Sequence, residues 1–240
     1  MAKTKPMIQV PVPLDTQADI NRSHYIRVPD TNCLIAREQA LNGYDFNGTL
    51  YKAAESKLSM PEPRIFMPYF VNVRQALEGK ITLYDGNNKP LAHKEVEELH
   101  KTLYSNCRTW LNAKFVKGSG YLDLDLASTR INTETKLSTR KNKNIESTKK
   151  ITCKEPLKKC INEDNIFVDL VFNPQGLPTR KSEIQEFKMG KNISFYHPRE
   201  NCVAGFDANP GRVYLDCSRG PQGSLAGVGV FLCAEGTPKN

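Results

Sequence analysis

Long apolar runs are absent from this chain, and tryptophan and histidine are scarce in it. Its 240 residues include one tryptophan and four histidines. No window of about eighteen residues is continuously apolar, so a transmembrane helix is not expected. The first residues carry no apolar segment of the signal-peptide type. We therefore expect no signal peptide and assign no cellular location.

Motifs for metal binding and for nucleophilic catalysis are also missing. The seven cysteines include no Cys-x-x-Cys pair, and no cysteine–histidine cluster has the spacing of zinc ligands. Cys153 and Cys160 are the pair expected to bond in an oxidising compartment, and free thiols are the default. His197 precedes a proline and is interpreted as the end of a strand, not as a general base. We expect no metal, no cofactor and no catalytic residue.

Positive charge is concentrated in one segment. The net charge is +8, and between residues 130 and 160 ten Lys and Arg residues outnumber three Glu residues. The segment is rich in Ser, Thr and Asn and has no steady hydrophobic period, which predicts a solvated loop or insertion. The alternative is a nucleic-acid-binding arm formed by residues 130–159. No aromatic residues interleave to stack on bases, so we favour the insertion and expect no nucleic acid.

Short elements are predicted in the first half of the chain, where prolines and glycines are frequent. Helical spacing predicts two short helices between Cys33 and Lys57. The segment Arg64–Val73 is rich in strand-forming residues and contains Pro68, which predicts an edge or interrupted strand. Lys80–Tyr84 predicts another strand, followed by a turn at 85–88.

The clearest helix is predicted near residues 92–106, where apolar residues recur at helical spacing. Further strands are predicted around Trp110 to Val116, at Tyr121–Leu126, at Ile166–Phe172 and at Asn192–Tyr196. In the segment 121–126, leucines alternate with Asp123 and Asp125. We interpret the two carboxylates as a solvent face, not as an acid–base pair.

A β-hairpin is predicted near the end of the chain. Cys202–Ala208 and Val213–Ser218 alternate in polarity on either side of the turn Asn209-Pro210-Gly211. One face is apolar, and the other carries small, polar and aromatic side chains, as antibody paratopes do. The expected ligand-binding residues lie on this second face and in the following loop: Val203, Gly205, Asp207, Asn209, Tyr214, Asp216, Ser218, Gly220, Gly223, Ser224, Leu225 and Ala226.

The composition changes in the same region. No Lys, Trp or Met occurs between Asn192 and Pro238. The pattern SFYHPRENCVAGFDANPGRVYLDCSRGP, followed by GVGVFLCAEG and preceded by FVDLVFNPQGLPTRKS, resembles the variable proteins of archaeal diversity-generating retroelements. In that family a reverse transcriptase copies a template repeat with errors at adenines, and the copy replaces a repeat at the 3′ end of the target gene. Varied AAC codons reach Asn, Asp, Gly, Ser and Tyr among others, but not Lys, Trp, Met or Gln.

The resemblance implies an α+β, C-type-lectin-like fold with short antiparallel strands, about two helices and much irregular structure. It also implies that the N- and C-terminal strands lie close together. Residues 1–60 would form an N-terminal extension packed on the domain, and residues 61–240 the domain itself. The domain would carry a basic insertion at 130–160 and a variable region at about 200–235. The chain lacks the Glu-Pro-Asn, Gln-Pro-Asp and Trp-Asn-Asp triplets of calcium-dependent lectins, so calcium-mediated sugar binding is not implied.

Under this resemblance, the expected function is recognition of variable macromolecular ligands, with proteins as the expected class. Lectin-fold relatives include formylglycine-generating enzymes, which need reactive cysteines. The cysteines of this chain lie mainly on predicted apolar faces, so we expect no enzymatic activity.

Overall fold

The computed structural model describes residues 20–117, 129–142, 145–157, 160–223 and 227–236. Within these ranges the chain forms an α+β structure with three α-helices and two β-sheets. The predicted α+β class is confirmed, with three α-helices instead of about two. None of the helices described is long and apolar enough to cross a membrane.

The smaller sheet joins the two ends of the described chain. It contains β1 (Tyr25–Arg27), β2 (Cys33–Ala40) and β10 (Val230–Glu235) in the order β1-β2-β10, with both neighbouring pairs antiparallel. The helix expected at the start of the segment 33–57 is therefore wrong. Leu34 and Ile35 are both fully buried, on opposite faces of β2. Because two adjacent apolar residues are also typical of a helix face, the sequence pattern did not distinguish this strand from a helix.

The larger sheet has seven strands in the order β5-β4-β3-β8-β9-β7-β6. Every neighbouring pair is antiparallel except β7 and β9, which are parallel. The predicted strand at Asn192–Tyr196 is confirmed as β7, and the strand predicted from residue 166 is shorter than expected. The strands are β3 (Cys107–Lys117), β4 (Thr129–Asn142), β5 (Ile145–Pro156), β6 (Ile166–Asp169), β7 (Asn192–Tyr196), β8 (Val203–Asn209) and β9 (Arg212–Arg219).

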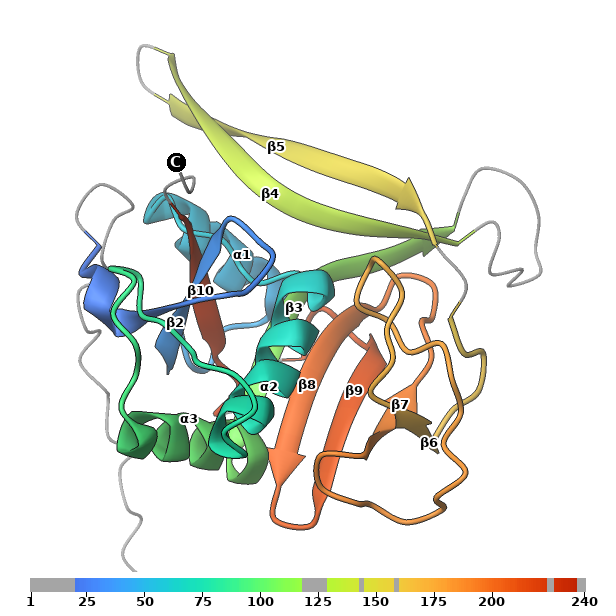
Figure 1. The fold of residues 1–240 in the computed structure, drawn as a ribbon. Coiled ribbons are helices and arrows are strands. Elements are labelled where there is room, and N and C mark those ends of the chain that lie inside the picture. Colours follow the sequence, from blue (N-terminus) through green and yellow to red (C-terminus); the bar gives the residue numbers. More distant parts are fainter. Residues whose placement is uncertain (1–19, 118–128, 143–144, 158–159, 224–226, 237–240) are drawn as a thin grey trace, which may run out of the picture.

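The basic segment is a β-hairpin and not the predicted loop. Strands β4 and β5 pair along almost their whole lengths, and β4 continues the sheet from β3. Figure 1 shows them as a long two-stranded ribbon that extends away from the rest of the molecule. Backbone pairing needs no hydrophobic period, and the many threonines favour extended chain, so a periodicity argument misses such a ribbon. The strand predicted at 121–126 lies outside the described residues.

The helices are α1 (Phe46–Glu55), α2 (Pro63–Leu77) and α3 (His93–Ser105). The strand expected at Arg64–Val73 is wrong, because this segment belongs to α2. Pro63 begins the helix, a position that tolerates proline well, whereas Pro68 lies inside it. Phe66, Phe70 and Val73 are buried at the i, i+4, i+7 spacing of one helix face, and their packing offsets the hydrogen bond that Pro68 removes.

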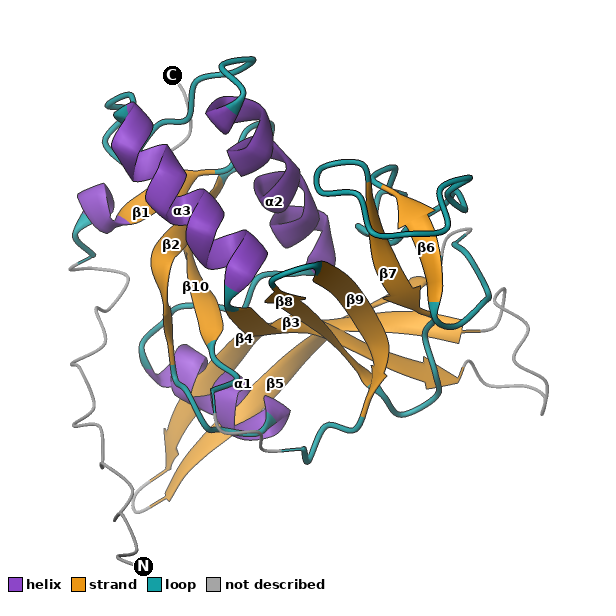
Figure 2. Cartoon of the chain, turned by 90° about the horizontal axis from the view of Figure 1, so that it is seen from below, coloured by secondary structure: helices purple, strands orange, loops and turns teal. Residues whose placement is uncertain are grey.

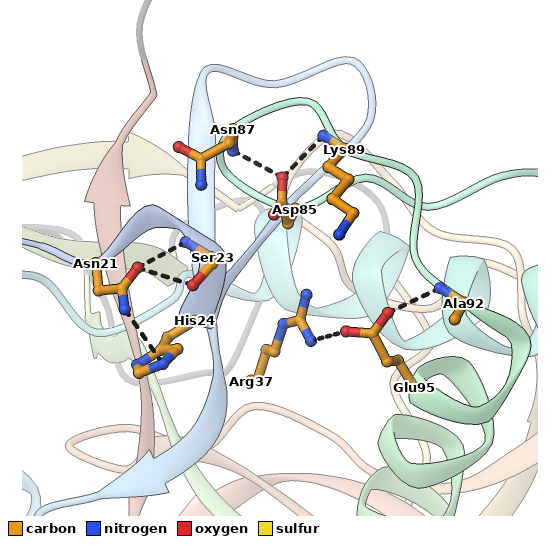
Figure 3. A network of polar contacts seen from close by, with 9 residues as sticks. All are labelled: Asn21, Ser23, His24, Arg37, Asp85, Asn87, Lys89, Ala92 and Glu95. Carbon is orange, nitrogen blue, oxygen red and sulfur yellow. Dashed lines mark hydrogen bonds and ion pairs between the residues drawn. The ribbon is translucent and has the colours of Figure 1, made fainter.

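The predicted helix near 92–106 is confirmed as α3. Its first turn is held by Glu95, whose carboxylate accepts a hydrogen bond from the Ala92 amide at 2.8 Å and pairs with Arg37 of β2 at 2.5 Å (Figure 3). Residues 80–84 form no continuous strand. The predicted turn after them is present, because the Asp85 carboxylate accepts from the amides of Asn87 and Lys89.

The apolar interior has two parts on opposite sides of the sheets. Helices α2 and α3 cover one face of β3, β8 and β9 (Figure 2), where Phe66 and Phe70 contact Phe206 with ring centroids 4.9 Å apart. On the other side, Phe46 of α1 packs edge-on against Trp110 of β3. Strand β10 contributes alternate residues to both parts, so both of its faces are buried.

Replacing Phe231 with alanine tests the packing of β10 against α2. Phe231 is fully buried, 5.9 Å from Phe66 and 6.4 Å from Tyr69 between ring centroids. Phe231→Ala should lower the free energy of unfolding by about 3–5 kcal/mol in urea titrations. Tyr84→Ala is the control, because Tyr84 is 43% exposed. Equal losses in the two variants would contradict the described core.

Candidate functional site

The predicted hairpin is formed by β8 and β9, which pair in antiparallel register with Asn209 opposite Arg212. Its apolar face is confirmed, because Ala204, Phe206, Val213, Leu215 and Cys217 are fully buried in the part of the interior beneath α2 and α3. We call the opposite side the polar face. It comprises the odd-numbered residues Val203 to Asn209 of β8, the even-numbered residues Arg212 to Ser218 of β9, and their neighbours Arg108, Trp110 and Tyr196.

Three residues predicted on the exposed face are buried. Val203 is fully buried, Asp207 is 4% exposed, and Gly205 is also buried. The cause is a second covering layer that strand alternation cannot show. Trp110 lies opposite Gly205 in β3 and packs against Phe46, and its indole Nε1 donates to the Tyr44 carbonyl at 3.1 Å.

Gly205 provides the space in which Arg219 lies. The pairing of β8 with β9 shifts register between Val203 and Gly205, which brings Arg219 onto the polar face. A β-carbon at position 205 would lie 2.7–2.8 Å from Cδ, Nε and Nη1 of Arg219, closer than atoms pack. The absence of a side chain therefore lets the arginine lie flat on the sheet.

Arg219 is paired with two carboxylates. It contacts Asp207, and its Nε lies 3.2 Å from Oδ2 of Asp216, while its guanidinium is 5.9 Å from the ring centroids of both Trp110 and Tyr214. Burial alone would lower the pKa of Arg219, but Asp207 and Asp216 raise it above its ordinary value. The arginine is thus a buried cation that holds β8 and β9 together.

The remaining predicted residues stay accessible where the structure describes them. Asn209, Tyr214, Asp216 and Ser218 are partly exposed, and Gly220 and Gly223 are exposed. Ser224, Leu225 and Ala226 lie outside the described residues. The accessible residues therefore lie along β9, at the hairpin tip and in the following loop.

Tyr214 and Arg212 form the centre of the accessible part. The Arg212 guanidinium lies 5.0 Å from the Tyr214 ring centroid, and its Nη2 donates to the Tyr196 hydroxyl at 2.9 Å. Tyr196 packs edge-on against Tyr214 with centroids 6.3 Å apart. Burial and the neighbouring Asp207 raise the pKa of Tyr214, so its hydroxyl remains protonated at neutral pH.

The sequence analysis did not single out Arg108, Trp110, Tyr196, Arg212 or Arg219. Arg212 could have been assigned to the polar face from the sequence, since it continues the alternation of Tyr214 and Asp216 along β9. Trp110 and Tyr196 come to the site only through strand pairing, which no single-strand pattern reveals. Arg219 comes to it through the register shift.

His197 lies in an ion-pair cluster, and several of the cysteines are buried. The His197 imidazole lies 2.8 Å from Asp164, which also pairs with Arg199. Burial raises the pKa of the thiols of Cys107, Cys217 and Cys233 well above the ordinary value, so they remain protonated. Within the described residues, no three His, Cys, Asp or Glu side chains are grouped as metal ligands would be.

Comparisons with known proteins return no family model, no curated protein and no solved structure that matches this chain.

Replacing Gly205 with alanine tests the arrangement of Arg219. The new methyl group would force the guanidinium away from Asp207, and only 11% of the Arg219 side chain is exposed. Gly205→Ala should therefore lower the free energy of unfolding by about 1–3 kcal/mol. The control is Gly220→Ala, where an added β-carbon meets no atom within 4 Å. Gly220→Ala should change the free energy of unfolding by no more than about 0.5 kcal/mol in the same denaturation experiment. If the two variants were equally stable, Gly205 would not be needed for Arg219.

Proposed function

We propose that this chain is a ligand-binding protein, not an enzyme, and that it recognises a macromolecular ligand, a protein, through the accessible part of the polar face. We define this part as Tyr196, Asn209, Arg212, Tyr214 and Ser218, together with Gly220 and Gly223 of the following loop. Ser224, Leu225 and Ala226 belong to the proposal on the sequence alone. The observation that carries the proposal is the contrast within one face of one sheet. Its buried part is fixed by the Arg219 ion pairs, while its accessible part presents aromatic, arginine and amide groups.

The chemistry of the accessible part suits protein recognition. Tyrosine offers a large contact area with few rotatable bonds, and arginine and asparagine supply hydrogen bonds. Tyr and Arg are also the residues that most often dominate binding energy at protein interfaces. Because paired strands hold these side chains, little conformational entropy is lost when a ligand binds.

We further propose that the surface is diversified by retroelement-directed adenine mutagenesis of codons at about 200–235. Burial and ion pairing make some of these positions poor candidates for variation. Val203, Gly205 and Asp207 are part of the framework, and Asp216 is linked to it through Arg219. Variation is therefore proposed at Asn209, Tyr214, Ser218 and the loop at 220–226.

A C-type-lectin-like fold belongs to the same proposal. The antiparallel pairing of β2 with β10 supports it, because it brings the first and last parts of the chain together. Helix α3 supports it as well, since a lectin-type fold implies a helix near residues 92–106.

Nucleic-acid binding through residues 130–159 is the second candidate function. The observation in its favour is the two-stranded ribbon of β4 and β5, a shape that fits the major groove of DNA. Its sequence carries most of the net positive charge.

Sequencing the DNA around the gene tests the proposed diversification. The expected result is a reverse-transcriptase gene and a near-copy of codons 200–235 that differs at adenines. The differing codons should include those of Asn209, Tyr214 and Ser218, whereas the codons of Val203, Gly205 and Asp207 should match. A neighbourhood without such a copy would contradict diversification.

A further inference from the structure

The arginines of the polar face differ in whether their charge is balanced. Arg219 is paired with Asp207 and Asp216 and lies beneath the surface. Arg108 and Arg212 are exposed, and among the described residues neither has a carboxylate within ion-pair distance. Together with Arg219, the polar face holds three arginines against the two carboxylates Asp207 and Asp216, so Arg108 and Arg212 leave it with a net positive charge.

Arg212 is held in place by neutral groups. Its Nη2 donates to the Tyr196 hydroxyl at 2.9 Å and to Oδ1 of Asn165 at 3.4 Å, and its guanidinium lies over the Tyr214 ring. The Tyr196 hydroxyl in turn hydrogen-bonds to Asn165 at 3.1 Å. These contacts orient the guanidinium and leave its charge available, with Nε and Nη1 making no hydrogen bond to any described residue.

Arg108 lies on the other side of Tyr214. In the sheet, Arg108 of β3 is opposite Asp207 of β8, and Asp207 is opposite Tyr214 of β9. The positive charge of Arg108 acts to lower the pKa of Tyr214, which agrees with this placement. Arg108 therefore lies two strands away from Tyr214 on the same face, and Arg212 lies two residues away from it along β9.

We infer that Arg108 and Arg212 bind carboxylates of an acidic segment of the partner protein, with the Tyr214 ring packed against the chain between them. This inference rests on the proposed function and specifies the chemistry of its ligand. A guanidinium pairs with a carboxylate through two parallel hydrogen bonds, and a preoriented one loses little entropy on binding.

The test uses fluorescein-labelled octaglutamate as the probe and fluorescence anisotropy at low ionic strength. The full chain should bind octaglutamate, and binding should weaken as salt is added. Arg212→Gln should reduce the affinity about tenfold, Arg108→Gln several-fold, and the double variant more than either. Arg212→Lys, which keeps the charge but not the planar fork, should give an intermediate loss.

Lys101→Gln is the matched control. It removes one positive charge from the exposed side of α3, a helix that packs on the opposite side of the sheet. Its affinity for octaglutamate should stay within about twofold of the unchanged chain. Far-ultraviolet circular dichroism of each variant checks that the fold is retained.

Three outcomes would overturn the inference. The first is no binding of octaglutamate by the unchanged chain, or equal binding of octaglutamine. The second is an equal loss for Lys101→Gln and Arg212→Gln, which would indicate general charge attraction. The third is oligothymidylate binding that depends on Arg108 and Arg212 when octaglutamate does not bind. A near-copy of codons 200–235 in the DNA would support diversification under any of these outcomes, so the two proposals fail separately.

Discussion

The guanidinium of Arg219 lies over Gly205 between two carboxylates, and the arrangement of the polar face depends on this contact. Asp207 belongs to β8 and Asp216 to β9, so the two ion pairs connect the strands through side chains as well as through the backbone. Trp110 covers the arginine, and Phe46 and Tyr44 fix the tryptophan in turn. A buried cation of this kind is stabilising only while all its partners remain in place, so each surrounding residue is constrained by the others.

This constraint separates buried from accessible positions within a single sheet surface. Val203, Gly205 and Asp207 are buried, whereas Asn209, Tyr214 and Ser218 are partly exposed. Tyr214 lies at the boundary, with Arg219 on one side and Arg212 on the other. A surface built in this way can present new side chains at its accessible end without loss of the fold, as a diversified binding protein requires.

The hairpin, α3 and β7 could be predicted from the sequence because each has a clear period of its own. Other features depend on residues far away in the chain. Cys33–Ala40 is a strand because β10 pairs with it, and Val203 is buried because Trp110, far earlier in the chain, packs in one apolar cluster with it and with Phe46 of α1. The strand-forming residues of Arg64–Val73 favoured an interrupted strand, yet this segment is helical, with Phe66 and Phe70 buried on one helix face. The site prediction therefore identified the correct face but not its division into buried and accessible parts.

A saturation scan of six polar-face positions, read out as the abundance of folded chain in cells, tests this division most directly. Substitutions at Val203, Gly205 and Asp207 are predicted to lower the abundance in nearly every case. Substitutions at Asn209, Tyr214 and Ser218 are predicted to leave it close to that of the unchanged chain. If the two groups tolerated substitution equally, or if the second group were the less tolerant, the account of a fixed framework with a variable end would be contradicted.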